Sequence, residues 1–258
     1  DGTSAMGLDQ AILLMGILGG KPAQVTMVQG QGNSPGLTVF RPNLGQNQPL
    51  GRKQQHLRVV GDSAAAVIEN RRRLTRELDL KATPRWLTQV HGTNVVRVED
   101  HDACADASIA SGPDNICVVM TADCLPVLFC NRSGTRVAAA HAGWRGLLAG
   151  VLEATLQHFD EPPANVLAWL GPAIGPEAFE VGEDVYNRYL SDDPATAVAF
   201  RANRPGHWLA DIYSLARRRL RAAGVEIVSG GEHCTFSDPK RFFSYRRDGI
   251  TGRMASLI

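Results

Sequence analysis

The chain has 258 residues, of which 44% are hydrophobic, and its 27 Lys and Arg residues are balanced by 26 Asp and Glu residues. This length and apolar content suffice for a substantial core. A net charge of +1 gives no reason to expect a nucleic acid or a membrane surface as partner. Five cysteines without a CxxC pair do not make a disulfide framework, so we expect a reducing, cytoplasmic location.

The first quarter of the chain has the weakest pattern. Residues 1–7 resemble an expression-vector scar and are left out of the fold prediction. Residues 8–60 mix Gln, Gly, Pro and Asn with two short strand candidates, 25–28 and 37–40. We expect residues 8–60 to be a divergent N-terminal segment of the same single domain as residues 61–258. The apolar run 11–18 is too short to span a bilayer, which takes about 20 residues.

Residues 62–258 contain helical and extended patterns in an irregular order. Asp62 and Ser63 are typical caps for a helix over 64–78. Further helices are expected at 146–156, 183–190 and 212–223, the last ending before Gly224. Strands are expected at 86–90, 95–99, 116–121, 127–130, 136–140, 166–170 and 225–228. Because strands and helices do not alternate regularly, the prediction is an α+β fold rather than a doubly wound sheet.

Three short segments each place a reactive side chain at the end of an apolar run. His91 and His141 follow strand-like runs, and Cys124 lies on a turn between two apolar strands. Two imidazoles and a thiolate suit zinc or copper and leave one coordination position open. An ion bound there would make water nucleophilic toward an electrophilic ring carbon. Without a metal, the same residues would form a Cys–His nucleophile pair, and the residues alone do not separate these two uses.

Arginine and aromatic side chains supply candidate substrate contacts. Arg145 opens a helix beside His141, and Arg246 and Arg247 follow Tyr245 near the C-terminus. Guanidinium groups match the paired oxygens of phosphate or carboxylate, and a tyrosine ring can stack on a heterocycle or a phenol. A surface loop for the arginines and core packing for the tyrosine are the structural alternatives.

Five ordered motifs resemble the YfiH family, which is also called the multicopper polyphenol oxidase or laccase-domain family and is described as purine nucleoside phosphorylase-like. The motifs are TQVHG, MTADCLPVLF, AAHAGWRGLLAG, GPAIGPEAFEVGEDV and CTFSDPKRFFSYRRDGITGRMASLI, within residues 61–258. The resemblance implies an α+β layered sandwich of mixed β-sheets flanked by helices, with a metal site at His91, Cys124 and His141. The N-terminal part departs from the family, because Thr26–Gly32 lacks the arginine usual there.

The resemblance implies several chemistries for one site. The leading prediction is a metal-dependent enzyme that acts on purine nucleosides by phosphorolysis, adenosine deamination or both, with Cys124, His91 and His141 as catalytic residues and metal ligands. Arg145, Arg246, Arg247 and Tyr245 would contact the substrate. Purine nucleoside and phosphate, or a phenol, are the expected small-molecule partners. The sequence predicts no oligomeric state.

A copper-dependent polyphenol oxidase is the first alternative prediction. Seven histidines without an HxH pair fit a conventional multicopper laccase poorly. The remaining alternatives are a cysteine hydrolase, a peptidoglycan-precursor editing enzyme and a zinc-stabilised protein without activity.

Overall fold

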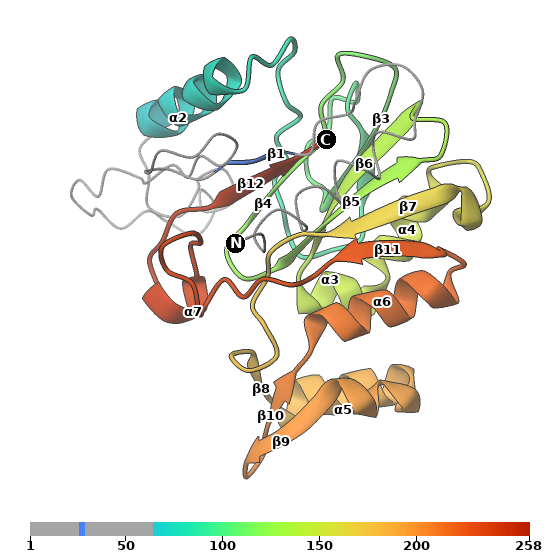
Figure 1. The fold of residues 1–258 in the computed structure, drawn as a ribbon, viewed down its shortest axis with the longest axis vertical. Helices are drawn as coiled ribbons and strands as arrows, with labels where there is room; N and C mark the ends of the chain where they lie inside the picture. Colours follow the sequence, from blue (N-terminus) through green and yellow to red (C-terminus); the bar gives the residue numbers. More distant parts are fainter. Residues whose placement is uncertain (1–25, 29–63) are drawn as a thin grey trace, which may run out of the picture.

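The structure is a computed structural model that describes residues 26–28 and 64–258 (Figure 1). The described residues form one six-stranded mixed sheet and two three-stranded antiparallel sheets, with helices packed on them. This arrangement confirms the predicted α+β class. The strand candidate 37–40 and the capping residues Asp62 and Ser63 lie outside the described residues.

The six-stranded sheet is the centre of the molecule and has the strand order β11–β7–β5–β6–β3–β2. Its strands are β2 (Val95–Arg97), β3 (Ala107–Ser111), β5 (Leu125–Asn131), β6 (Arg136–Ala142), β7 (Val166–Leu170) and β11 (Ile227–Gly230). β5 pairs antiparallel with both β6 and β7 and is buried along its whole length. Successive side chains of a strand point to opposite faces, so a strand buried throughout requires that both faces of the sheet are covered.

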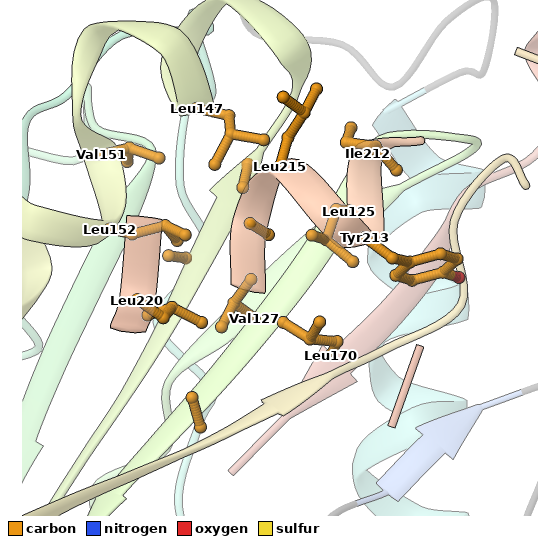
Figure 2. Close-up of a cluster of buried hydrophobic side chains, with 14 of the residues drawn as sticks. Leu125, Val127, Leu147, Val151, Leu152, Leu170, Ile212, Tyr213, Leu215 and Leu220 are labelled. Carbon is orange, nitrogen blue, oxygen red and sulfur yellow. The ribbon is translucent and has the colours of Figure 1, made fainter. Parts of the chain in front are cut away.

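Helices cover one face of the central sheet. They are α3 (Trp144–Ala149), α4 (Val151–Gln157) and α6 (Ile212–Ala222). Figure 2 shows Leu147, Leu152 and Leu220 of these helices beside Leu125 and Val127 of β5. On β6 the residues of this face are alanines, and their small side chains let the helices approach the sheet closely. Full burial of one such leucine stabilises the fold by about 1.5–3 kcal/mol.

A second sheet covers the opposite face of the central sheet. It consists of β1 (Thr26–Val28), β12 (Met254–Leu257) and β4 (Val118–Thr121), with β12 in the middle. Leu128 of β5 and Ala139 of β6 pack in one buried cluster with Val119 of β4. Helix α2 (Ala64–Glu77) lies outside this sheet and packs Leu74 against Val118 (Figure 1).

A third sheet lies at the opposite end of the molecule from α2 (Figure 1). It contains β8 (Glu180–Gly182), β10 (His207–Ala210) and β9 (Phe200–Arg204), in that order, beside α5 (Glu183–Asp192). Tyr186 of α5 stacks on Trp208 of β10 with ring centroids 4.3 Å apart, which fixes the helix on the sheet. The remaining described elements are the 3-10 helices η2 (Pro163–Asn165) and η3 (Pro194–Ala199) and the short helix α7 (Tyr245–Asp248).

The structure corrects two of the predicted elements. The helix expected over 146–156 is divided into α3 and α4, because Gly150 has a φ of 98° and ends α3 in the left-handed conformation. The strand expected over 86–90 is wrong. Arg85 forms only an isolated bridge with Cys117, and the Gln89 side chain instead hydrogen-bonds both backbone groups of Met120 at 2.8 Å.

Candidate metal and substrate site

Three segments of the chain bring His91, Cys124 and His141 together. His91 follows the segment that Gln89 attaches to β4, Cys124 lies in the turn between β4 and β5, and His141 is near the end of β6. Their ligand atoms all lie within 4.8 Å of one another. His91 is exposed, Cys124 is half-buried and His141 is buried, so the cluster opens to solvent on the His91 side. The structure therefore groups the three predicted ligands in an arrangement that could hold a metal ion.

Asp106 supports two members of this cluster from behind. It is fully buried, and its carboxylate lies 2.8 Å from Nδ1 of His141. The backbone N–H groups of Val90, His91 and Gly92 donate to the same carboxylate at 2.7–3.1 Å. Since Nδ1 of His141 is held by Asp106, its Nε2 is the nitrogen left to bind a ligand. One carboxylate thus orients the His141 ring and holds the turn that carries His91.

The backbone around the cluster adopts conformations that the sequence pattern did not predict. His91 has a φ of 61° and Asp123 a φ of 91°, both in the region that favours glycine. Such conformations are costly for other residues and persist where surrounding contacts hold them. The three N–H bonds to Asp106 hold the turn at His91 in this way.

Gly143 lies against the cluster at the start of α3. A Cβ atom at this position would lie 2.9 Å from Cδ2 of His91 and 3.1 Å from Sγ of Cys124. Both distances are shorter than an ordinary contact between carbon or sulfur atoms, so a side chain would displace the two predicted ligands. The predicted motif AAHAGWRG therefore contributes a ligand, His141, and also the space in which the ligands meet.

Replacing Gly143 by alanine is expected to weaken metal binding by roughly 10-fold, because the new methyl group pushes His91 and Cys124 apart. Metal affinity measured by calorimetry checks this. Gly182→Ala is the matched control, since its Cβ would meet only the flexible side chain of Asp184, at 2.9 Å. Equal loss in both variants would show a general effect of added bulk rather than displacement of the ligands.

Cys124 and His141 change each other's protonation. Burial alone would raise the pKa of the Cys124 thiol, but the charge of His141 and polar contacts with both imidazoles outweigh burial and lower this pKa to about 6. Burial would lower the pKa of His141, yet the Cys124 thiolate and the Asp106 carboxylate raise it to about 9. The metal-free site at neutral pH is therefore a thiolate–imidazolium pair, and the thiolate is the form that binds metals or attacks electrophiles.

Alkylation of the metal-free protein should reveal this thiolate. Below pH 6 the Cys124 thiol is protonated and unreactive, so the rate with iodoacetamide should rise with pH through about 6, far below the ordinary value of 9.0. Mass spectrometry of the peptide that contains Cys124 measures the rate. A rate that rises only near pH 9 would contradict the thiolate–imidazolium pair.

The structure places the predicted substrate-binding residues in two groups. Arg145 is exposed on α3, and its guanidinium carbon lies 4.4 Å from the centroid of the Trp144 ring. The other three residues lie on α7, where Tyr245 is 58% exposed and therefore accessible to a ligand. Arg246 donates to the backbone oxygen of Glu180 at 2.8 Å.

Arg247 lies deeper than its neighbours on α7. Its guanidinium donates to the backbone oxygens of Thr235, Phe236 and Phe242 at 2.9–3.0 Å and also binds Asp248. These contacts join the segment 235–242 to α7. From the sequence, a position on a surface loop was the only structural role expected for Arg247. Substrate binding by Arg247 stays a prediction.

The sequence interpretation missed Asp106 and Arg253. Arg253 precedes β12, whose first residue Met254 pairs with Thr121, so Arg253 lies beside the strand end that leads to Cys124. Burial lowers the pKa of Arg253, while the charges of Cys124 and Asp123 act in the opposite sense, as expected for a cation near this site. An acid between two alanines, directly before β3, was the only sequence signal for Asp106.

A family model described as multi-copper polyphenol oxidoreductase laccase matches residues 48–258. The chain belongs to this family. A protein named YfiH is among the relatives described below, so the predicted resemblance to the YfiH family is confirmed.

Two curated relatives and two solved structures of the YfiH family illustrate the similarity. Purine nucleoside phosphorylase YfiH of Escherichia coli is 54% identical over 201 residues, which is 77% of this chain and 82% of the relative. A purine nucleoside phosphorylase of Pseudomonas aeruginosa is 56% identical over the same shares. A Neisseria meningitidis structure is 47% identical with a TM-score of 0.74, covering 84% of this chain and 88% of that one. YlmD of Geobacillus stearothermophilus is 27% identical with a TM-score of 0.72, covering 93% and 92%.

Among the described residues, no helix is both long enough and apolar enough to cross a membrane.

Proposed function

We propose that this chain is a purine nucleoside phosphorylase whose active site is the cluster of His91, Cys124 and His141. The observation that carries the proposal is the convergence of these three ligand atoms within 4.8 Å on a buried carboxylate support. The proposal is supported by two relatives more than 50% identical to the chain that are named purine nucleoside phosphorylases.

The donor set fits a metal ion of borderline softness. Two imidazoles and one thiolate are typical of zinc and are also accepted by copper. The fourth coordination position would be open, since the cluster found among the described residues has three members. A zinc ion held by His91, Cys124 and His141 would supply Lewis-acid stabilisation of negative charge that develops during the reaction.

The protein's own residues would bind and orient the substrates. In phosphorolysis an oxygen of phosphate forms a bond to C1′ of the ribose while the bond from C1′ to the purine nitrogen breaks, and the base leaves with that electron pair. Arg145, Arg246, Arg247 and Arg253 are candidate cations for phosphate, since guanidinium groups bind its oxygens in pairs. The exposed ring of Tyr245 is suited to stack on a purine. Asp106 would keep the His141 ring in one orientation throughout.

Incubation of the purified protein with inosine tests the proposal directly. Hypoxanthine and ribose 1-phosphate should form only when phosphate is present, and chelation should stop the reaction. Adenosine is a second substrate to test, because inosine formed from it without phosphate would show deamination in addition. If neither nucleoside yields free base or inosine, the proposal is wrong.

A copper-dependent oxidase of phenols is the second candidate. It is favoured by the description of the matching family model and by the acceptance of copper by the same donors. The described residues offer one cluster rather than the several sites of a conventional laccase. Metal analysis followed by oxygen uptake with a phenol decides the matter, because uptake that does not depend on copper would remove this candidate.

A metal-free cysteine hydrolase is the third candidate, favoured by the thiolate–imidazolium pair of Cys124 and His141. Hydrolysis that persists in chelated protein and stops after alkylation of Cys124 would support it. Activity restored only by added metal would count against it.

A further inference from the structure

Asp123 occupies a conformation that needs an explanation. It immediately precedes Cys124 in the turn between β4 and β5. Its φ of 91° lies in the region that glycine adopts without strain and other residues rarely adopt. The residue is only 8% exposed, although it carries a carboxylate. A residue of this kind stays in such a conformation only where its surroundings hold it there.

The carboxylate of Asp123 accepts hydrogen bonds from three groups that are distant in sequence. The hydroxyl of Thr235 donates to Oδ1 at 2.6 Å, and the hydroxyl of Ser244 and the backbone N–H of Arg246 donate to Oδ2 at 3.0 and 2.7 Å. These partners are 112–123 residues further along the chain. The backbone oxygen of Asp123 also accepts from the N–H of Ile174 at 2.9 Å. Both oxygens of this buried carboxyl group therefore accept hydrogen bonds from neutral donors.

These bonds connect the thiol turn to helix α7. Ser244 is the N-cap of α7, and its hydroxyl oxygen accepts from the N–H of Arg247 at 3.2 Å while its proton points to Asp123. The N–H of Arg246 belongs to the first turn of the same helix, which carries the predicted substrate residue Tyr245. Asp123 thus contacts the segment expected to bind substrate, and its backbone continues into Cys124.

We propose that Asp123 is a positioning residue that holds the Cys124 thiol in reach of His91 and His141 and fixes α7 beside it. It acts through Cys124 and through α7, and the structure shows no contact between its carboxylate and the three ligand atoms. The inference rests on the metal site of the proposed function but not on the identity of the substrate. Loss of the Asp123 contacts would let the turn relax and move the thiol away from the two imidazoles.

Cobalt(II) binding to the metal-free full-length chain tests this, because a thiolate ligand produces a charge-transfer absorption band. Asp123→Gly removes the carboxylate. Because glycine adopts a positive φ without strain, the variant should fold. Its cobalt affinity should fall by roughly 10–100-fold, the usual effect of losing a supporting group, and its band per bound cobalt should weaken. Asp123→Asn keeps an acceptor for Ser244 and Arg246, and the Thr235 hydroxyl can accept from the new amide. This variant should therefore retain most of the affinity.

Two further variants and two controls complete the experiment. Thr235→Val and Ser244→Ala each remove one donor to Asp123 and should weaken cobalt binding by a smaller factor. The matched controls Thr196→Val and Ser256→Ala remove buried hydroxyls that do not contact Asp123. Cobalt affinity should be unchanged in both controls.

Unchanged affinity and an unchanged band in folded Asp123→Gly would overturn the inference. If that variant fails to fold, unchanged cobalt binding in both Thr235→Val and Ser244→Ala would overturn it instead. A wild-type chain that shows the thiolate band but does not cleave nucleosides would contradict the proposed function and leave the role of Asp123 standing.

Discussion

Cys124→Ser should abolish metal-dependent activity. The serine hydroxyl is a poor ligand at neutral pH, whereas the Cys124 thiol has a pKa of about 6 and is already ionised. Loss of an outer partner of a metal ligand costs roughly 10–100-fold in affinity, so loss of the ligand itself should exceed 100-fold. Metal content after dialysis and the rate of inosine phosphorolysis measure the effect. The fold should survive, because the substitution removes no buried apolar group.

Cys104→Ser is the control for this prediction. Cys104 is exposed and lies outside the cluster, so its substitution should change neither metal content nor rate. If Cys124→Ser retained its metal and its activity, Cys124 would not be a ligand. Retained metal with lost activity would assign Cys124 to chemistry rather than to binding.

Asp106→Asn is the second substitution with a large expected effect. All the groups that contact the Asp106 carboxylate are donors, three backbone N–H groups and the Nδ1–H of His141. An amide has one oxygen and an NH₂ group, so at least one of these donors would face another donor. We expect the free energy of unfolding to fall by about 1–3 kcal/mol and metal affinity to fall by roughly 10–100-fold. Chemical denaturation and calorimetry measure the two quantities.

Asp211→Asn is the matched control for Asp106→Asn. Asp211 is the N-cap of α6 and accepts from the N–H groups of Tyr213 and Ser214, so asparagine can replace it with little loss. Metal affinity should stay at the wild-type value in this variant. If Asp106→Asn were destabilised but bound metal normally, Asp106 would support the fold without orienting His141.

Local sequence patterns predicted the elements whose boundaries depend on local signals. The strand predicted at 166–170 has the same bounds as β7, because a continuous apolar run between turn residues suffices to define it. The helix predicted at 212–223 ends within one residue of α6, because Asp211 caps its start and Gly224, with a φ of 94°, follows its end.

Elements whose sequences look polar or short were missed. β9 is almost entirely exposed and contains Arg201, Asn203 and Arg204, so no apolar run marks it in the sequence. It is a strand because β10 pairs with it. β12 lies at the C-terminal end and is a strand because it pairs with β4, more than a hundred residues earlier in the chain. Pairing partners at such separations leave no local signature for a strand.

The residues of the candidate site likewise include some that local sequence predicts and others that only contacts between distant segments reveal. The residue types and their positions directly after apolar runs or in a turn sufficed to predict His91, Cys124 and His141 as one group. Only the tertiary structure decided what holds them, since Asp106 reaches His141 across 35 residues and Asp123 reaches α7 across more than a hundred. A ligand is recognised by its own chemistry, whereas a supporting carboxylate resembles any other acid until the folded chain surrounds it with donors. The sequence by itself therefore determined which atoms can bind a metal, and the packing of distant segments determined their orientation.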